Sequence, residues 1–368
     1  MYVTYKVKEK NPFDFNSLFD AMLNNEEVPE IKAGPLTFKT ICLSEAQIQE
    51  AQLPKAYNTY DMFTQLFKQA EKFKKNIKKP IEEYYKTFQI PKASGGFRTI
   101  SAPEEALNQL LKETLYMFEY RLHALPSEAT FAFTHHRNTK LALVKHQENQ
   151  SRWFLKLDIK DFFPSCNEDF IIEQLNQLFP FGDINKYDND NETLRTIIQY
   201  CLLNGSLPQG SPMSPLLTNL IMIPFDYKLL NKLPKEMVYT RYADDIIISS
   251  PYNFNWKKIA DMVKSILEPQ FKIKDSKTRY GSCAGRNWNL GLMYNKDLNI
   301  TVGWRNKKHL KSQLVHLVYH HQEMTELEIQ QLQGIIAYYK AIEPEYFNYI
   351  IEKYSEHFET DINTLLKP

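Results

Sequence analysis

The sequence predicts a mixed α/β (α+β) fold in which an antiparallel sheet carries clustered acidic residues. Three segments support this fold class: a strand–turn–strand hairpin over residues 238–248, a strand that begins at Trp153, and a helix that follows a proline-rich loop near residue 214. With 368 residues, the chain is long enough for two or three domains or lobes, each with its own core.

The hairpin places Asp244 and Asp245 in a turn between two runs of β-branched and aromatic residues. A carboxylate with apolar flanks must be paired or must bind a metal when it is buried. The two acids therefore indicate a cation held at the edge of a sheet. A solvated Asp-Asp turn in an ordinary hairpin is the alternative.

The upstream strand, WFLKLDIK over residues 153–160, alternates with a period of two. Its leucines and isoleucine face one way, and Asp158 faces the other way with the two lysines. We expect the apolar face to pack on a core and Asp158 to project into a cleft. Pro164 is expected to end the strand.

A rigid loop separates these two acidic segments. It lies within LPQGSPMSPLLTNL, residues 207–220, where three prolines and Gly210 fall within a few positions. Ser214 followed by Pro215 is typical of an N-cap and a first helical turn, and apolar residues follow at helical spacing. Gln209 on the loop is placed to contact the sugar or base edge of a substrate.

The overall charge argues against a small, basic nucleic-acid-binding domain but still permits a larger protein that binds a polyanion locally. The formal net charge is only +1, so the chain lacks the global basic field of a small nucleic-acid-binding domain. Basic residues are nevertheless concentrated in residues 72–79 and 305–311, which are either solvated helix faces or contacts for a polyanion. Four scattered cysteines and the absence of an apolar stretch of about 18 residues predict a cytoplasmic protein in a reducing compartment.

Taken in order, LDIKDFFPS, LPQGSPMSPLLTNL and YADD resemble the palm of a reverse transcriptase. IPKASGGFRTISAP, residues 90–103, resembles the fingers hairpin of bacterial retron-type and group II intron enzymes. FKIKDSKT resembles a later palm motif, WNLGL the segment that grips the primer, and residues 332–349 a retron-type thumb. The resemblance covers roughly residues 85–350.

The resemblance implies a right-hand polymerase fold with fingers, a palm built on an antiparallel sheet, and a helical thumb. The corresponding boundaries are an N-terminal extension over residues 1–80, fingers over 81–150, a palm over 151–285, and primer grip and thumb over 286–368. Finger insertions are expected at about residues 166–206 within the palm.

The resemblance also implies RNA-directed DNA polymerase activity, which adds dNMPs to a primer 3′-hydroxyl. Two Mg²⁺ ions, with Mn²⁺ as a substitute, would be held by Asp158 and Asp244, with Asp245 accessory and the Ile159 carbonyl completing the coordination. Lys277 matches the lysine thought to protonate the leaving pyrophosphate, although an ordinary surface lysine is the alternative.

The implied nucleotide contacts come from the fingers and from the strand after Asp158. Arg98 would clamp the triphosphate, with Lys92 as a second clamp or merely a solvated hairpin lysine. Phe163 would lie under the sugar and exclude a 2′-hydroxyl, unless it is a core aromatic residue. Phe163 and Ala243 both oppose an RNA-dependent RNA polymerase.

Two elements depart from the retron pattern. Leu141-Ala142-Leu143-Val144-Lys145-His146 stands where retron enzymes carry Asn-Ala-x-x-His, and Asn289-Leu290-Gly291 stands where they carry Val-Thr-Gly. Those elements are tied to recognition of a retron's own RNA. The sequence therefore does not decide whether such an RNA is a partner of this chain. A zinc site at His316 and His320 is the weaker alternative for the 309–321 histidines, because no third ligand is evident.

Group II intron enzymes add a maturase domain after the thumb, which this sequence does not show, so a stand-alone retron-like enzyme is favoured. We expect an RNA template, a DNA or RNA primer and dNTPs as partners, a dedicated non-coding RNA or effector protein beside them, and a role in bacterial antiviral defence. The alternatives are template-independent or protein-primed DNA synthesis by a defence-associated enzyme of the abortive-infection type, a group II intron-like enzyme, an RNA-dependent RNA polymerase and a non-catalytic nucleic-acid-binding protein. The sequence implies no particular oligomeric state.

Overall fold

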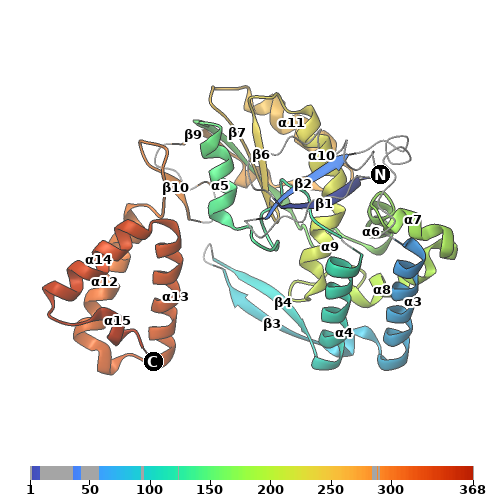
Figure 1. Cartoon of the computed structure of the whole chain (residues 1–368), viewed down its shortest axis with the longest axis horizontal. Coiled ribbons are helices and arrows are strands. Elements are labelled where there is room, and N and C mark those ends of the chain that lie inside the picture. Colours follow the sequence, from blue (N-terminus) through green and yellow to red (C-terminus); the bar gives the residue numbers. More distant parts are fainter. Residues whose placement is uncertain are drawn as a thin grey trace.

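The computed structural model describes residues 2–8, 36–42, 58–92, 95–122, 124–283, 288 and 291–367. The predicted mixed fold with antiparallel sheets is confirmed. A central sheet with its helices lies between a second group of helices and a separate helical bundle at the C-terminal end of the chain, as Figure 1 shows. Two strands near the N-terminus, β1 (Tyr2–Lys8) and β2 (Leu36–Cys42), pair antiparallel.

The central sheet has the order β6-β7-β5-β8, and β9 also pairs with β5. Its strands pair antiparallel with one another. They are β5 (Trp153–Lys160), β6 (Val238–Tyr242), β7 (Asp245–Ser250), β8 (Lys272–Ile273) and β9 (Arg279–Ser282). The β6–β7 hairpin confirms the predicted strand–turn–strand segment. The register sets Asp158 on β5 opposite Asp245 on β7.

The period-two prediction for β5 is confirmed. Leu155, Leu157 and Ile159 are almost wholly buried in one core, together with residues of the helices behind the sheet. Phe154, on the opposite face, stacks on Trp288 in a second core shared with the C-terminal bundle. The sheet is therefore buried on one face and only partly covered on the other, where Asp158 lies.

Two boundaries differ from the predictions. The strand ends at Lys160 and not at Pro164, because Asp161 adopts a left-handed φ of 47° that breaks the extended chain. Helix α9 (Met213–Ile221) begins before Ser214, so Ser214 is not its N-cap. The Ser211 hydroxyl accepts from the Met213 amide at 3.4 Å, and the buried Ser214 hydroxyl has no hydrogen-bond partner among the described residues.

Helices pack behind the sheet and extend away from it. Helix α3 (Thr59–Asn76) packs on α4 (Glu105–Tyr116) and α8 (Glu192–Cys201), and its buried residues join the same core as β5. The other helices of this part are α5 (Thr139–Glu148), α6 (Glu168–Leu175), α7 (Phe181–Ile184), α10 (Ile223–Lys232) and α11 (Trp256–Leu267), with a π-helical turn at Met117–Arg121. The basic run at 72–79 is partly neutralised, since Lys72 pairs with Glu113 at 3.1 Å and Lys74 pairs with Glu71 at 3.2 Å.

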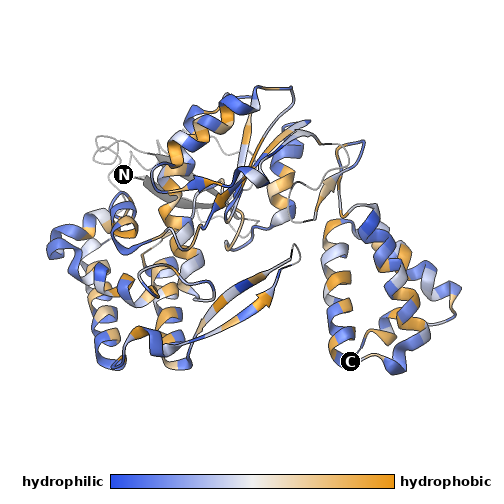
Figure 2. Ribbon diagram, turned by 180° about the vertical axis from the view of Figure 1, so that it is seen from behind, coloured by the Kyte–Doolittle hydropathy of each residue, from blue (hydrophilic) through white to orange (hydrophobic). Residues whose placement is uncertain are grey.

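A separate hairpin projects from the α3–α4 side toward the C-terminal bundle (Figures 1 and 2). Its strands, β3 (Tyr85–Pro91) and β4 (Phe97–Pro103), pair with Ile90 opposite Arg98. The hairpin contacts the loop before α9, because the Ser101 amide donates to the Gln209 carbonyl at 2.7 Å. The predicted fingers hairpin is thus present and is joined to the predicted Pro-Gly loop.

The C-terminal bundle confirms a helical segment where a thumb was predicted. A short β10–β11 pair (Met293–Tyr294 with Ile300–Thr301) precedes α12 (Trp304–His320), α13 (Glu326–Ile342), α14 (Pro344–His357) and α15 (Ile362–Leu365). Within the described ranges, none of the helices has the length and apolar character needed to cross a bilayer.

Candidate active site

The three predicted acidic residues lie at the same end of the central sheet. Asp158 lies on β5, and Asp244 and Asp245 lie at the β6–β7 turn. The Ile159 amide donates to the Asp244 carbonyl at 2.9 Å, which fixes the turn against the strand end. Ala243 takes a left-handed φ of 56°, and this conformation closes the tight turn that brings Asp244 beside β5.

Lysines compensate two of the three acids. Lys277 donates to Asp158 at 2.6 Å, and Lys156 donates to Asp245 at 2.7 Å. Asp244 forms no ion pair with any residue that the structure describes. Burial, followed by the neighbouring Asp245 charge, raises the pKa of the Asp244 carboxyl above its ordinary value. The hydrogen bond to Asp158 raises the pKa of Lys277, which keeps its ammonium group protonated at neutral pH.

A buried ion pair fixes the turn from below. Arg241 on β6 and Asp226 on α10 are both 0% exposed and lie 2.9 Å apart. Arg241 also donates to the Ala243 carbonyl at 3.3 Å and to the Thr130 hydroxyl at 2.6 Å. Tyr239 donates to Asp226 at 2.6 Å. A buried, hydrogen-bonded pair of this kind resists rearrangement, so it supports the turn that carries Asp244.

The predicted nucleotide contacts lie on the β3–β4 hairpin, on the loop before α9 and just after the end of β5. Arg98 and Lys92 are exposed on the β3–β4 hairpin. Gln209 is half-buried on the loop that contacts β4. Phe163 is half-buried, edge-on to Phe162 at 5.7 Å, and packs against the core with part of its ring exposed. Phe162 is the core aromatic residue of the pair, at 3% exposure.

The order of these elements has a counterpart among known proteins. Residues 90–323 match the family described as "Reverse transcriptase (RNA-dependent DNA polymerase)". This chain belongs to the reverse transcriptase family. It is accordingly a nucleotidyltransferase, an RNA-directed DNA polymerase.

Several relatives of this reverse transcriptase are named for retrons. The Retron Ec73 reverse transcriptase of Escherichia coli is 30% identical over 287 residues, which are 74% of this chain and 88% of that protein. The Retron Ec83 reverse transcriptase of Escherichia coli is 24% identical and covers 83% of this chain and 94% of its own length. The Retron Mx65 reverse transcriptase of Myxococcus xanthus is 27% identical over 73% of this chain and 64% of its own.

Solved structures of telomerase align with the fold at low identity. Apo telomerase from Candida tropicalis truncated from its C-terminal domain has a TM-score of 0.42 and 15% identity, over 66% of this chain and 60% of the telomerase chain. Telomerase from the same organism with a fragment of telomeric RNA has a TM-score of 0.43 over 76% of this chain.

The carboxylates of this reverse transcriptase fit the divalent ions that the family generally uses. Carboxylate and carbonyl oxygens are the donors that hard cations prefer. Asp158 is only 5% exposed, and Asp244 is half-buried with a raised pKa, so both would gain from a cation. Among the described residues no three acidic, histidine or cysteine side chains already converge on one point, because Asp158 and Asp245 each turn toward a lysine.

The sequence did not single out three of the residues at the site. Lys156 and Arg241 contact the turn or its acids and Asp226 pairs with Arg241, but none of the three lies in a motif that marks it. The sequence signal that could have pointed to Lys156 is its position two residues before Asp158, on the same face of the strand. Asn289 and Leu290 of the expected primer grip lie outside the described residues, while Trp288 is buried at 1% exposure.

Three of the histidines make structural contacts with neighbouring side chains. His146 on α5 is fully buried and hydrogen-bonds Ser249 at 2.6 Å and Thr240 at 2.8 Å, so it joins α5 to both strands of the β6–β7 hairpin. Burial lowers its pKa to about 3, which keeps the ring neutral. His316 and His320 stack on each other at 4.7 Å, and His320 lies 3.0 Å from Glu323.

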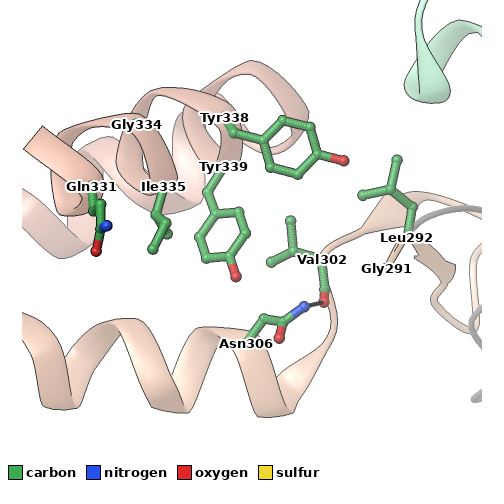
Figure 3. A pocket seen from close by; sticks show the side chains of 9 residues that line it. All are labelled: Gly291, Leu292, Val302, Asn306, Gln331, Gly334, Ile335, Tyr338 and Tyr339. Carbon is green, nitrogen blue, oxygen red and sulfur yellow. Dashed lines mark hydrogen bonds between the residues drawn. The ribbon is translucent and has the colours of Figure 1, made fainter. Parts of the chain in front are cut away.

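A cavity of about 530 Å³ lies between the thumb helices and the segment after Trp288. Gln331, Gly334, Ile335 and Tyr338 of α13 line one wall, as Figure 3 shows, and Leu292 and Val302 lie opposite. A Cβ added at Gly334 would meet nothing within 4 Å. Glycine in a helix interior costs about 1 kcal/mol, so this bare helix surface is a costly feature that packing does not explain.

Proposed function

We propose that the chain copies RNA into DNA by extending a primer 3′-hydroxyl with deoxynucleotides at Asp158 and Asp244. The observation that carries the proposal is the apposition of these two acids, with Asp158 paired in register to Asp245 and the Ile159 amide bonded to the Asp244 carbonyl. Repelling carboxylates held together at a sheet edge have a chemical purpose only if a cation joins them.

We infer that Asp158, Asp244 and the Ile159 carbonyl hold two Mg²⁺ ions, for which Mn²⁺ can substitute. When bound, the ions would stabilise the attacking and leaving oxygens of the displacement. The protein contributes position: the Arg241–Asp226 pair holds the turn, and the Lys277 ammonium, protonated at neutral pH, is suited to donate a proton to the leaving pyrophosphate.

The nucleotide would lie between the fingers hairpin and the strand end. The Arg98 guanidinium offers paired donors for phosphate oxygens, and Lys92 offers a second positive charge on the same hairpin. The exposed part of the Phe163 ring is proposed to lie under the sugar and to exclude a 2′-hydroxyl, and Gln209 to contact the sugar or base edge.

The template–primer duplex would leave along the thumb. This route is supported by the exposed side of α13, where Gly334 permits close approach of a sugar–phosphate backbone and Tyr338 offers a polar aromatic edge. A DNA or RNA primer and an RNA template are the partners that this arrangement favours.

The test is to sequence nucleic acid that co-purifies with the wild-type protein and with Asp244→Asn. The proposal expects RNA with both proteins and a complementary DNA strand with the wild type alone. DNA with no complement in the RNA would favour template-independent synthesis, and DNA linked to the polypeptide would favour protein priming. Either result would overturn templated extension of a nucleic-acid primer.

We further propose that the enzyme serves bacterial antiviral defence, alone or with a dedicated non-coding RNA or effector protein. The family match and the retron names of the relatives motivate this role, and the chain before residue 80 offers material for a specific partner surface. The test is phage plating on cells with the native locus or its Asp244→Asn form. Equal plaquing on both across a broad phage panel would contradict the defence role.

A further inference from the structure

Lys156 lies beside the carboxylates of the proposed metal site but has no role in the chemistry proposed for them. It is on β5 two residues before Asp158, so both side chains project from the same face of the strand. Its ammonium group lies 2.7 Å from Asp245, and the two side chains are only 18% and 16% exposed. The contact is diagonal, because the residue directly opposite Asp245 is Asp158.

The surroundings of Lys156 restrict it to this contact. Phe154, its neighbour on the same face, is fully buried in the core that holds Trp288, and Ile247 opposite Lys156 belongs to that core as well. The ammonium group therefore cannot turn toward that end of the strand without entering an apolar core. Arg279 on β9 is paired in register with Lys156 and is exposed, so its positive charge also disfavours a turn of Lys156 away from the acids.

The two lysines at the site differ in a way that matters for metal binding. Lys277 is 53% exposed on a short 3-10 turn and can leave Asp158 for solvent or substrate. Lys156 is mostly buried on the central strand and has no such alternative. When a divalent ion approaches, Lys277 can move away from Asp158, whereas Lys156 stays paired with Asp245.

We propose that Lys156 is a positioning residue that holds Asp245 out of the metal coordination sphere, leaving Asp158 and Asp244 as the side chains that bind the ions. The inference rests on the proposed function, since it assumes that divalent ions bind at Asp158 and Asp244. It assigns Asp245 the role of a fixed counter-charge: the Lys156–Asp245 pair is neutral as a unit and reduces the repulsion among the three carboxylates.

The proposal predicts opposite effects for the two halves of the pair. Lys156→Met removes a positive charge and frees Asp245, so the protein should bind Mn²⁺ about fivefold or more tightly. Asp245→Asn leaves Lys156 uncompensated beside the site and should weaken Mn²⁺ binding. The double variant Lys156→Met/Asp245→Asn replaces a neutral pair by a neutral pair and should bind Mn²⁺ within about threefold of wild type.

The measurement is a Mn²⁺ titration of the full-length protein without nucleotide, followed by the EPR signal of free Mn²⁺. Asp244→Asn is the reference for loss of a ligand and should weaken binding about tenfold or more. Lys160→Met is the matched control, because Lys160 is on the same strand and face but is 59% exposed and 4.0 Å from Asp161. It should change the affinity by less than about twofold. Thermal unfolding of each variant in EDTA shows that it is folded.

The outcomes separate the inference from the proposed function. If the double variant loses as much affinity as Asp244→Asn, Asp245 is itself a metal ligand and the inference is wrong. If Lys156→Met behaves like Lys160→Met, the lysine does not control Asp245. If wild type and Asp244→Asn bind Mn²⁺ equally, the metal site of the proposed function fails instead.

Discussion

Gly210 joins the fingers to the palm, and Gly210→Ala should weaken both folding and nucleotide binding. Gly210 has a φ of 121°, which side chains rarely adopt, and an added Cβ would lie 2.7 Å from the Ser101 carbonyl oxygen and 2.9 Å from Ile100. One of these neighbours is backbone, so the clash is relieved only by moving the loop away from β4. That movement breaks the hydrogen bond between the Ser101 amide and the Gln209 carbonyl.

The magnitude follows from these contacts. Forcing a side chain into such a backbone conformation costs about 1–3 kcal/mol, and loss of a partly buried hydrogen bond costs about 1 kcal/mol. We expect Gly210→Ala to lower the free energy of unfolding by about 2–4 kcal/mol. Gly205→Ala is the matched control, since Gly205 has a φ of 74° but no atom within 4 Å of its added Cβ. It should cost only about 1 kcal/mol.

Urea unfolding and steady-state kinetics together test this reasoning. Gly210→Ala should also raise the KM for dNTP by about fivefold or more, because Gln209 and the β4 strand that carries Arg98 lose their common anchor. Gly205→Ala should leave the KM within about twofold. Equal losses of stability in the two variants, with unchanged KM in both, would refute the claim that this glycine couples fingers and palm.

Three further predictions concern the sugar of the nucleotide, the Asp244 carboxyl and a buried histidine. Phe163→Ala should lower the ratio of dNTP to rNTP specificity constants by about tenfold or more, and an unchanged ratio with activity preserved would mean that another residue excludes the 2′-hydroxyl. The pKa of Asp244 is raised in the folded protein, so the folded state holds this proton more tightly than the unfolded chain and loses stability as pH rises through that pKa. In EDTA at pH 8, Asp244→Asn should therefore melt at a higher temperature than wild type, and the difference should be smaller at pH 5. A lower melting temperature of the variant at both pH values would contradict this. The pKa of His146 is lowered to about 3, so in acid the unfolded chain binds a proton that the folded protein does not. The free energy of unfolding should therefore fall by about 1.4 kcal/mol per pH unit below about pH 6.5. His146→Gln should flatten this slope in urea unfolding, and an identical slope would assign the pH dependence to other groups.

Strand β5 and the β6–β7 hairpin could be predicted from the sequence because their signals are local. Alternation along residues 153–160 gave the orientation of Asp158, and apolar runs around Asp244 gave the hairpin. The sequence motifs gave the chain order of Arg98, Gln209 and Lys277, and the fold then brought Lys277 to Asp158. The predicted domain boundaries stay predictions.

The remaining features depend on contacts between distant parts of the chain. Arg241 and Asp226 are 15 positions apart and no local sequence signal pairs them, yet both are fully buried and form an ion pair. The cap of α9 was assigned to Ser214 because Ser-Pro is a common start, whereas the preceding Ser211-Pro212 already begins the helix. The contact between Lys156 and Asp245 spans 89 positions and depends on strand register, which alternation alone does not fix.

Asp158 and Asp244 are proposed to carry out DNA synthesis on an RNA template. The most direct test of this proposal is extension of a DNA primer on an RNA template with dNTPs and Mg²⁺, by wild type, Asp158→Asn and Asp244→Asn, with circular dichroism as the check of folding. Loss of a metal ligand typically removes several kcal/mol of transition-state stabilisation, so both folded variants should lose about 10³-fold or more in incorporation rate. Near wild-type incorporation by either folded variant would contradict the account.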